Sequence, residues 1–191
     1  MKSDLIVKEY FNNRVKLIIP KLYKDKRGYF LESFNKKKID KIISSTEFVQ
    51  DNISYSINKF TIRGIHFQKP PHNQSKIITV LDGEILDVVL DINPKSKHFG
   101  KYKLFKLNSE NNKYLYISDD FAHGFCTLRK NTKVLYKVSK YYNPQSEKTI
   151  LWSDSKIKIK FPKSKKYFLS PKDKIGHKFE TLQKTFKLFQ K

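Results

Sequence analysis

The chain has 191 residues, enough to bury one hydrophobic core but short for two, so we expect a single folded domain. It carries 40 Lys and Arg against 18 Asp and Glu, a formal net charge of +22, with 15 Phe, 11 Tyr and 6 Gly. The aromatic content argues against disorder, and the lysines alternate with apolar residues instead of clustering, so the charge indicates a solvated surface that attracts small anions and not a nucleic-acid partner.

Export and membrane insertion are not indicated either. No run of about 18 apolar residues exists, and the N-terminal stretch MKSDLIVKEYFNNR interrupts its apolar positions with charge. We therefore expect no membrane partner and a cytoplasmic location. Cys126 is the single cysteine, so no internal disulfide can form, and its setting in AHGFCTLRK favours a small buried strand residue over a nucleophile.

Short amphipathic strands dominate the predicted elements. In chain order, a helix is expected at KKKIDKIISS (36–45), followed by strands at EILDVVLDIN, KYKLFKLN, KYLYIS, TKVLYKVSKYY and KIKIKF, and then by helical turns at SPKDK (170–174) and GHKFETLQKTFKLFQK (176–191). Many short strands at regular spacing predict a β-sandwich or barrel. We assign one domain to residues 1–175 and a basic amphipathic extension to residues 176–191. The helical spacing of its apolar residues predicts that this extension packs on the barrel or on a second copy.

Polar side chains gather in Thr61–Gln68, with the sequence TIRGIHFQ. Strict alternation along a strand would place Arg63 and His66 on opposite faces, whereas a bulge at Gly64 could bring them together, so the local pattern leaves this open. Further polar groups occur at His123, at Tyr136 with Tyr141 and Tyr142, and at Lys172 with Asp173. Each is weak alone, because a single histidine in a β-domain is more often structural than catalytic.

Taken together, these segments carry a resemblance to a known family. The motifs DKRGYFLESF, FVQDNISYS, RGIHFQKPPHNQSKIITVLDGEILDVVLDINPKSKHFGKY, FAHGF, YKVSKYYNPQSE, ILWSD and LSPKD occur in the order typical of the dTDP-4-dehydrorhamnose 3,5-epimerases, over about residues 5–175. The chain resembles this family, which implies an all-β, double-stranded β-helix (cupin or jelly-roll) fold with a few short helices.

The resemblance also implies a reaction and a set of residues. The family epimerises carbons 3 and 5 of dTDP-4-dehydro-6-deoxy-D-glucose to give dTDP-4-dehydro-L-rhamnose, without metal or cofactor. It implies His66 as base, Asp173 as its orienting carboxylate, Tyr136 as acid and Lys76 as the cation beside the enolate. Substrate contacts are implied for Arg27, Glu32, Gln50, Asn52, Arg63, His123, Tyr142, Glu147 and Lys172. The expected pathway is deoxysugar biosynthesis, with L-rhamnose for a surface polysaccharide as the end use.

By the same resemblance we expect a homodimer that exchanges an N-terminal strand, in which Arg27 and Glu32 serve the neighbour's site. Three alternatives stay open. The first is an epimerase that inverts a single carbon of another 4-keto-6-deoxy sugar nucleotide. The second is a metal-dependent cupin using His66, His72 and His123, and the third is a non-catalytic sugar-nucleotide binding module. The metal reading lacks the usual H-x-H followed by Glu, since position 68 is Gln.

Overall fold

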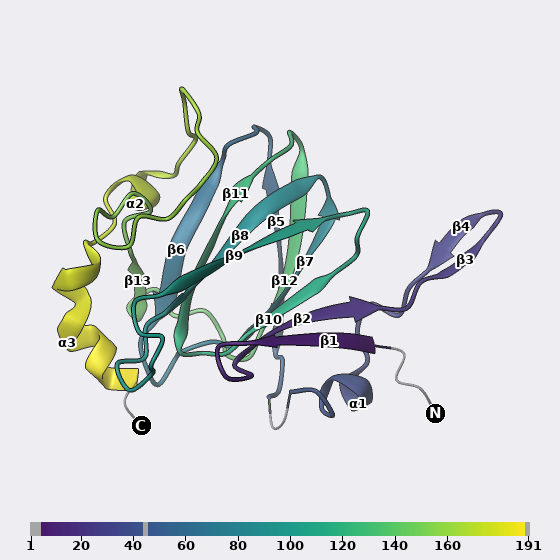
Figure 1. Ribbon diagram of the computed structural model, residues 1–191, viewed down its shortest axis with the longest axis horizontal. Coiled ribbons are helices and arrows are strands. Elements are labelled where there is room, and N and C mark those ends of the chain that lie inside the picture. Colours follow the sequence, from purple (N-terminus) through teal and green to yellow (C-terminus); the bar gives the residue numbers. More distant parts are fainter. Residues whose placement is uncertain (1–4, 44–45, 190–191) are drawn as a thin grey trace.

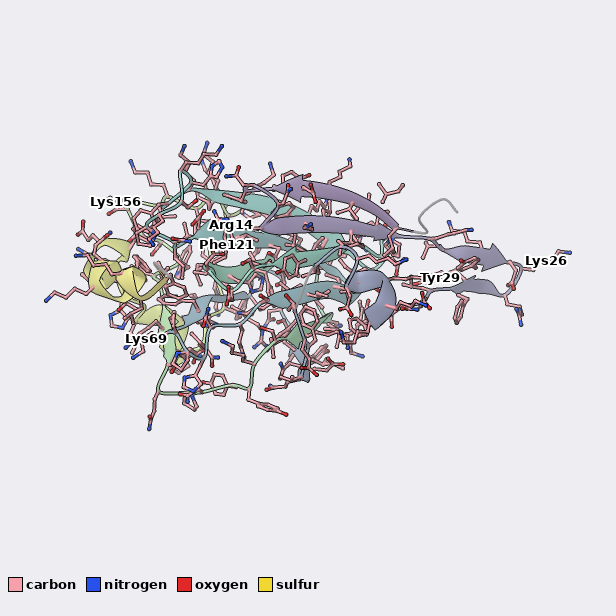
Figure 2. The ribbon with its side chains drawn as sticks, turned by 90° about the horizontal axis from the view of Figure 1, so that it is seen from below. Arg14, Lys26, Tyr29, Lys69, Phe121 and Lys156 are labelled. Atoms are coloured by element: carbon pink, nitrogen blue, oxygen red, sulfur yellow. The ribbon has the colours of Figure 1, made fainter. Side chains whose placement is uncertain are left out.

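The computed structural model describes residues 5–43 and 46–189. Within them, two antiparallel sheets stack as a jelly-roll barrel, also called a double-stranded β-helix (Figure 1). The larger sheet has the strand order β1-β2-β10-β7-β12-β5, and the second sheet has the order β13-β6-β11-β8-β9. The predicted all-β fold class is confirmed. A separate hairpin, β3-β4, projects away from the barrel, with Lys26 and Tyr29 on it (Figure 2).

The larger sheet is formed by β1 (Leu5–Tyr10), β2 (Val15–Pro20), β5 (Gln50–Ser56), β7 (Lys76–Asp82), β10 (Tyr114–Ile117) and β12 (Thr132–Val138). The second sheet is formed by β6 (Ile62–Gln68), β8 (Glu84–Asp91), β9 (Tyr102–Asn108), β11 (Phe121–Thr127) and β13 (Glu147–Thr149). The projecting hairpin is formed by β3 (Tyr23–Asp25) and β4 (Gly28–Phe30). The helical elements are α1 (Lys36–Ile39), α2 (Pro171–Lys174), α3 (Gln183–Phe186) and the 3-10 turns η1 (Phe179–Leu182) and η2 (Lys187–Phe189).

Buried aliphatic side chains from both sheets meet between them. Almost fully buried members of this core are Val15, Ile78, Ile85, Val89, Leu107, Leu115, Ile117 and Val134. Burying each such side chain contributes about 1.5–3 kcal/mol to folding. The strands that carry polar side chains therefore belong to a packed and rigid frame. Among the described residues, no helix has the length and hydropathy that crossing a bilayer would require.

The turn between β1 and β2 is fixed to the second sheet by Arg14 (Figure 2). Its guanidinium lies over the Phe121 ring, 4.8 Å from the centroid, and donates to Asp91 at 2.5 Å and to Asp120. Asp91 ends β8 and is fully buried. A charged pair that is buried with extra hydrogen bonds fixes geometry strongly, because removing one member strands the other.

Three predicted elements differ in the structure. The strand expected at TKVLYKVSKYY ends at Val138. KIKIKF (156–161) is not a strand, since the Asp154 side chain accepts hydrogen bonds from the backbone N–H groups of Lys156 and Ile157, and Lys158 has a left-handed φ of 54°. This turn breaks the extended run that the alternation predicted. The helix expected over 36–45 is helical only at Lys36–Ile39. Its residues 44 and 45 lie outside the described residues, as do positions 190 and 191 of the C-terminal segment.

The C-terminal segment packs on the outside of the second sheet, as predicted for its apolar face. Phe179, Leu182, Phe186 and Phe189 are buried in one cluster with apolar side chains of β6 and β8. The Phe186 ring lies 5.8 Å from that of Phe67 on β6. The segment alternates 3-10 and α turns instead of forming one regular helix. Its division from residues 1–175 as an extension stays a prediction.

A bulge at Gly64 decides the direction of the polar side chains on β6. His66 faces His123 on β11 while Arg63 faces Phe125, so β6 has one more residue than β11 over this interval. Gly64 has a φ of +106°, and a Cβ there would lie 2.7 Å from the carbonyl oxygen of His123. Only glycine fits such a conformation at such an approach. The bulge places Arg63 and His66 at the same cavity, the alternative that the sequence left open.

Candidate active site

A polar cavity of about 690 Å³ lies between the two sheets. The residues predicted for the site that line it are Gln50, Asn52, Arg63, His66, Lys76, His123, Tyr136, Tyr142, Glu147, Lys172 and Asp173. They come from strands of both sheets, from α2 and, for Tyr142, from the segment between β12 and β13, which are far apart in the sequence. The fold thus gathers into one cavity side chains whose proximity no local pattern could predict.

His66 is held by a carboxylate from outside the barrel strands. Its Nε2 lies 2.6 Å from Oδ1 of Asp173, which is only 3% exposed. The Ser170 hydroxyl caps α2 by accepting from the Asp173 backbone N–H, and it donates to Oδ2 of the same residue at 2.8 Å. Burial opposes ionisation of Asp173, but its hydrogen bonds, that of His66 foremost, outweigh burial and lower its pKa. Asp173 is therefore a fixed anion against one ring nitrogen of a partly exposed histidine.

Tyr136 stands on the other wall, on β12 of the larger sheet. Partial burial raises the pKa of its phenol, although the positive charge of Arg63 acts in the opposite direction. The phenol is protonated at neutral pH and can donate a proton into the cavity. Arg63 itself donates to the Ser56 hydroxyl at 3.0 Å and to the Tyr55 carbonyl at 2.7 Å, which fixes its guanidinium.

Lys76, His123 and Asp87 form a second group of charges at the cavity. Burial lowers the pKa of Lys76 to about 8, while the charges of Glu147 and Asp87 act to raise it. His123 Nε2 lies 2.7 Å from Oδ2 of the fully buried Asp87. Burial lowers the pKa of His123 and raises that of Asp87. Sequence reasoning missed Asp87, although a charged residue among the apolar positions of EILDVVLDIN was an available signal.

The mouth of the cavity is built around Tyr142 and Glu147. The Tyr142 hydroxyl donates to Oε2 of Glu147 at 2.8 Å, and Lys172 donates to the same oxygen at 2.7 Å. Burial opposes ionisation of Glu147, but these two bonds and the nearby His66 outweigh it and lower its pKa. The Gln50 side chain accepts from the Tyr142 backbone N–H at 3.3 Å and donates to Asn52 at 2.8 Å. Aromatic, acidic and basic groups are thus linked at one edge.

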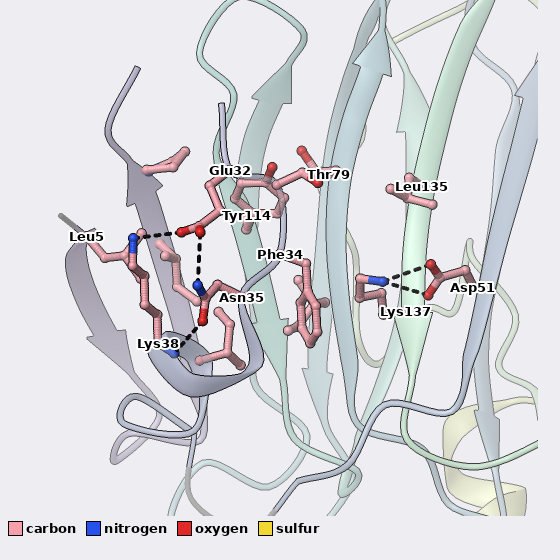
Figure 3. A pocket seen from close by; sticks show the side chains of 15 residues that line it. Leu5, Glu32, Phe34, Asn35, Lys38, Asp51, Thr79, Tyr114, Leu135 and Lys137 are labelled. Carbon is pink, nitrogen blue, oxygen red and sulfur yellow. Dashed lines mark hydrogen bonds and ion pairs between the residues drawn. The ribbon is translucent and has the colours of Figure 1, made fainter. Parts of the chain in front are cut away.

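Arg27 and Glu32 do not reach this cavity within one chain. The Arg27 side chain is 90% exposed on the projecting hairpin and pairs with Asp25. Glu32 pairs with Lys38 at 2.6 Å and accepts from Asn35 at 2.9 Å. It lines a separate cavity of about 130 Å³ (Figure 3). The predicted roles of these two residues would therefore need a second copy of the chain.

The three histidines of the metal alternative have separate partners. His66 bonds to Asp173, His123 to Asp87, and His72 lies 2.9 Å from the Ser146 hydroxyl. Across residues 5–43 and 46–189, His, Cys, Asp and Glu side chains form no group of three or more that could hold a metal ion. Cys126 is fully buried and its thiol has a pKa raised by burial to about 12, which fits the predicted inert strand residue.

Comparison with known proteins identifies relatives along most of the chain. Residues 13–181 match the family model described as dTDP-4-dehydrorhamnose 3,5-epimerase. The dTDP-4-dehydrorhamnose 3,5-epimerase of Shigella flexneri is 42% identical over 161 residues, covering 84% of this chain and 88% of the relative.

Two solved structures share the fold. The dTDP-4-dehydrorhamnose 3,5-epimerase of Bacillus anthracis with TDP and PPi bound is 41% identical, with a TM-score of 0.88 over 92% of this chain and 99% of that one. The dTDP-6-deoxy-D-glucose-3,5-epimerase of Legionella pneumophila in complex with dTDP-4-keto-L-rhamnose is 34% identical, with a TM-score of 0.91 over 98% of each chain.

The barrel and its relatives define the class, which is that of the jelly-roll isomerases acting on nucleotide sugars. Within that class, the chain belongs to the dTDP-4-dehydrorhamnose 3,5-epimerase family.

Proposed function

We propose that this chain inverts carbons 3 and 5 of dTDP-4-dehydro-6-deoxy-D-glucose to give dTDP-4-dehydro-L-rhamnose, with His66 as base and Tyr136 as acid. One observation carries the assignment of roles. His66 and Tyr136 line one cavity from opposing sheets, on β6 and β12. Inversion needs a proton to leave one face of a carbon and to return to the other, so it needs two proton-transferring groups on opposite sides of the sugar.

Each inversion proceeds through an enolate. His66 takes the proton from a carbon beside the keto group, and the electron pair of the C–H bond moves into a C=C bond while the carbonyl electrons move onto oxygen. Lys76 stabilises that oxygen, with Arg63 and His123 as further donors at the cavity. Tyr136 then protonates the carbon from the opposite face. Solvent returns one proton to Tyr136 and accepts one from His66, so the chain ends as it began.

Asp173 is a positioning residue in this scheme. Its carboxylate lies 2.6 Å from His66 Nε2, and its lowered pKa keeps it ionised at neutral pH. The anion fixes the orientation of the imidazole ring, with Nε2 toward Asp173 and Nδ1 pointing away from it. It also stabilises the imidazolium that forms.

The nucleotide is proposed to bind at the cavity mouth. Tyr142 offers an aromatic face for stacking on thymine, and Lys172 and Arg63 offer charge-assisted donors to phosphate. Gln50, Asn52 and Glu147 supply neutral and anionic partners for the thymine and the sugars. The Bacillus anthracis and Legionella pneumophila relatives carry TDP and dTDP-4-keto-L-rhamnose, which supports a dTDP-sugar as the ligand.

The homodimer with an exchanged N-terminal strand is likewise proposed. Arg27 and Glu32 lie away from their own chain's large cavity, on or beside a hairpin with exposed Tyr29 and Phe30. The outer face of the larger sheet also exposes apolar side chains, Ile53 at 66% among them. Mixing inactive Arg27→Ala and His66→Ala chains tests exchange, because a mixed dimer would regain one complete site. Activity that stays absent in a mixture shown to contain mixed dimers would contradict it.

Proton NMR in deuterated water tests the reaction. We expect dTDP-4-keto-6-deoxyglucose incubated with the chain to exchange hydrogen at both carbons flanking the keto group, and a reductase then to yield the rhamnose nucleotide. Exchange at one carbon would indicate the single-site epimerase. No exchange would favour another sugar nucleotide or a binding module, and loss of activity on chelation would favour the metal-dependent cupin. We further propose that the enzyme acts in the cytoplasm, in deoxysugar biosynthesis for a surface polysaccharide.

A further inference from the structure

Tyr142 stands on a stretch of chain that no sheet supports. β12 ends at Val138 and β13 begins at Glu147, so residues 139–146 have no ladder of their own. The Tyr142 side chain is 51% exposed. In an irregular segment the backbone φ and ψ angles can change at little energetic cost. A half-exposed ring there keeps a fixed direction only if contacts from other segments fix its backbone.

The backbone on both sides of Tyr142 is held by the side chain of Gln68. Gln68 is the last residue of β6 and only 5% exposed. Its Oε1 accepts from the Asn143 backbone N–H at 2.7 Å. Its Nε2 donates to the Tyr141 carbonyl at 3.4 Å and to the His72 carbonyl at 2.6 Å. One buried amide therefore bonds the main chain directly before and directly after the aromatic residue.

Further contacts join the same two segments. His72 Nδ1 lies 2.9 Å from the Ser146 hydroxyl, and the Lys140 ammonium donates to the Pro71 carbonyl at 2.7 Å. The Gln74 side chain donates to the Lys140 carbonyl at 2.6 Å. Residues 69–74 thus lie along residues 139–146, and Gln68 and Ser146 are buried members of these contacts.

We propose that Gln68 is a positioning residue for nucleotide binding, which acts by fixing the backbone of residues 141–143 so that Tyr142 presents its ring to the base. The inference rests on the proposed nucleotide site. Gln68 does not line the cavity, so it acts on the ligand through Tyr142. Binding a backbone N–H and a backbone carbonyl at the same time requires an acceptor and a donor on one short side chain. An amide supplies both, whereas an ionised carboxylate supplies only acceptors.

The test is the affinity for dTDP, measured by calorimetry, together with kcat and KM. Gln68→Met keeps the length and removes the hydrogen bonds. Leaving buried backbone groups unsatisfied should raise the dTDP Kd and the KM about tenfold, with kcat within about twofold. Gln145→Met is the matched control, because Gln145 is exposed on the same segment and we expect its Kd to be unchanged.

A double-mutant cycle identifies the route of the effect. In a Tyr142→Ala background, Gln68→Met should change the Kd less than about twofold, because the ring that it positions is gone. An additive loss would overturn the inference, as would a fall in kcat at unchanged KM or an unchanged Kd in Gln68→Met alone.

A milder variant covers failure of Gln68→Met to fold. His72→Ala removes the contact to Ser146 and should raise the Kd about threefold, again only when Tyr142 is present. A Kd that His72→Ala leaves unchanged, or raises equally without Tyr142, would overturn the inference. Failure of the wild-type protein to bind dTDP would contradict the proposed nucleotide site itself. If the wild type binds dTDP and Gln68→Met binds it with the same Kd, only the inference about Gln68 is contradicted.

Discussion

The cavity holds two histidine–aspartate pairs of nearly equal geometry and unequal surroundings. His66 and His123 face each other across β6 and β11, and their Nε2 atoms lie 2.6 and 2.7 Å from the carboxylates of Asp173 and Asp87. Asp173 comes from the short helix α2, where Ser170 also bonds it. Asp87 lies within β8, fully buried and with Oδ1 lacking any hydrogen-bond partner that the structure describes.

The difference in surroundings favours different roles for the two pairs. Hydrogen bonds lower the pKa of Asp173, so its anion is ready to stabilise an imidazolium. Burial raises the pKa of Asp87 and lowers that of His123, which opposes charge separation there. We therefore assign proton transfer to the first pair and fixed hydrogen bonding beside Lys76 to the second.

Removal of the base should give the largest effect. His66→Ala should lower kcat by about 10³–10⁴-fold, because it removes the imidazole that takes the proton in the proposed mechanism. Its melting temperature should stay within a few degrees of wild type. Steady-state kinetics and a thermal melt measure both. An active His66→Ala chain would refute the proposed mechanism.

The acid on the opposite wall offers an equally direct test. Tyr136→Phe should lose most epimerisation, about 10²–10⁴-fold, and keep its fold, since the ring still packs. Because His66 is intact, solvent deuterium exchange should survive better than inversion. NMR of the recovered sugar separates the two. Exchange and inversion that fall equally would argue against Tyr136 as the acid that completes inversion.

The carboxylates of the two pairs should respond differently to the same change. Asp173→Asn keeps the hydrogen bond and removes the charge, so we expect kcat to fall about 10²-fold and the pH profile of kcat to move. Asp87→Asn should lower kcat much less. Kinetics on the two variants, side by side, provide the comparison. Equal losses would remove the distinction between the pairs.

Lys76 should set the alkaline limit of activity. In the proposed mechanism its ammonium stabilises the enolate, and burial lowers its pKa to about 8, so kcat should fall about tenfold per pH unit above that value. Between about 8 and the ordinary 10.5, the folded chain holds fewer protons at Lys76 than the unfolded chain, so this residue's contribution to stability rises with pH. A rate that declines while stability rises would be diagnostic, and a flat rate up to pH 10 would contradict the role.

The smallest effect is a shift of that limit. The negative charge of Asp87 supports the protonated form of Lys76, so Asp87→Asn should move the alkaline limb to lower pH. The pH profile of kcat/KM, compared with that of the wild type, measures the shift. An unmoved limb would mean that the two charges do not interact.

Most of the residues that the family resemblance implied for the site line one cavity, whereas the sequence predicted less where tertiary structure decides. Alternation predicted the strand around Tyr136 and failed for KIKIKF, because side-chain capping by Asp154 is invisible to periodicity. The shared direction of Arg63 and His66 depends on a one-residue bulge, which a period of two cannot reveal. The role of Asp87 and the hydrogen bonds from Gln68 to the backbone around Tyr142 were missed, because both residues contact side chains or backbone distant in the sequence.

Gly64, at the bulge of β6, limits which residues this position can accept. A side chain at position 64 would meet the His123 carbonyl at 2.7 Å and the Gly124 Cα at 2.8 Å. Straightening the strand to avoid that clash would turn either Arg63 or His66 out of the cavity. We therefore expect almost every substitution at position 64 to abolish activity. In a saturation library selected for turnover, active variants should keep glycine there even where adjacent positions accept other residues.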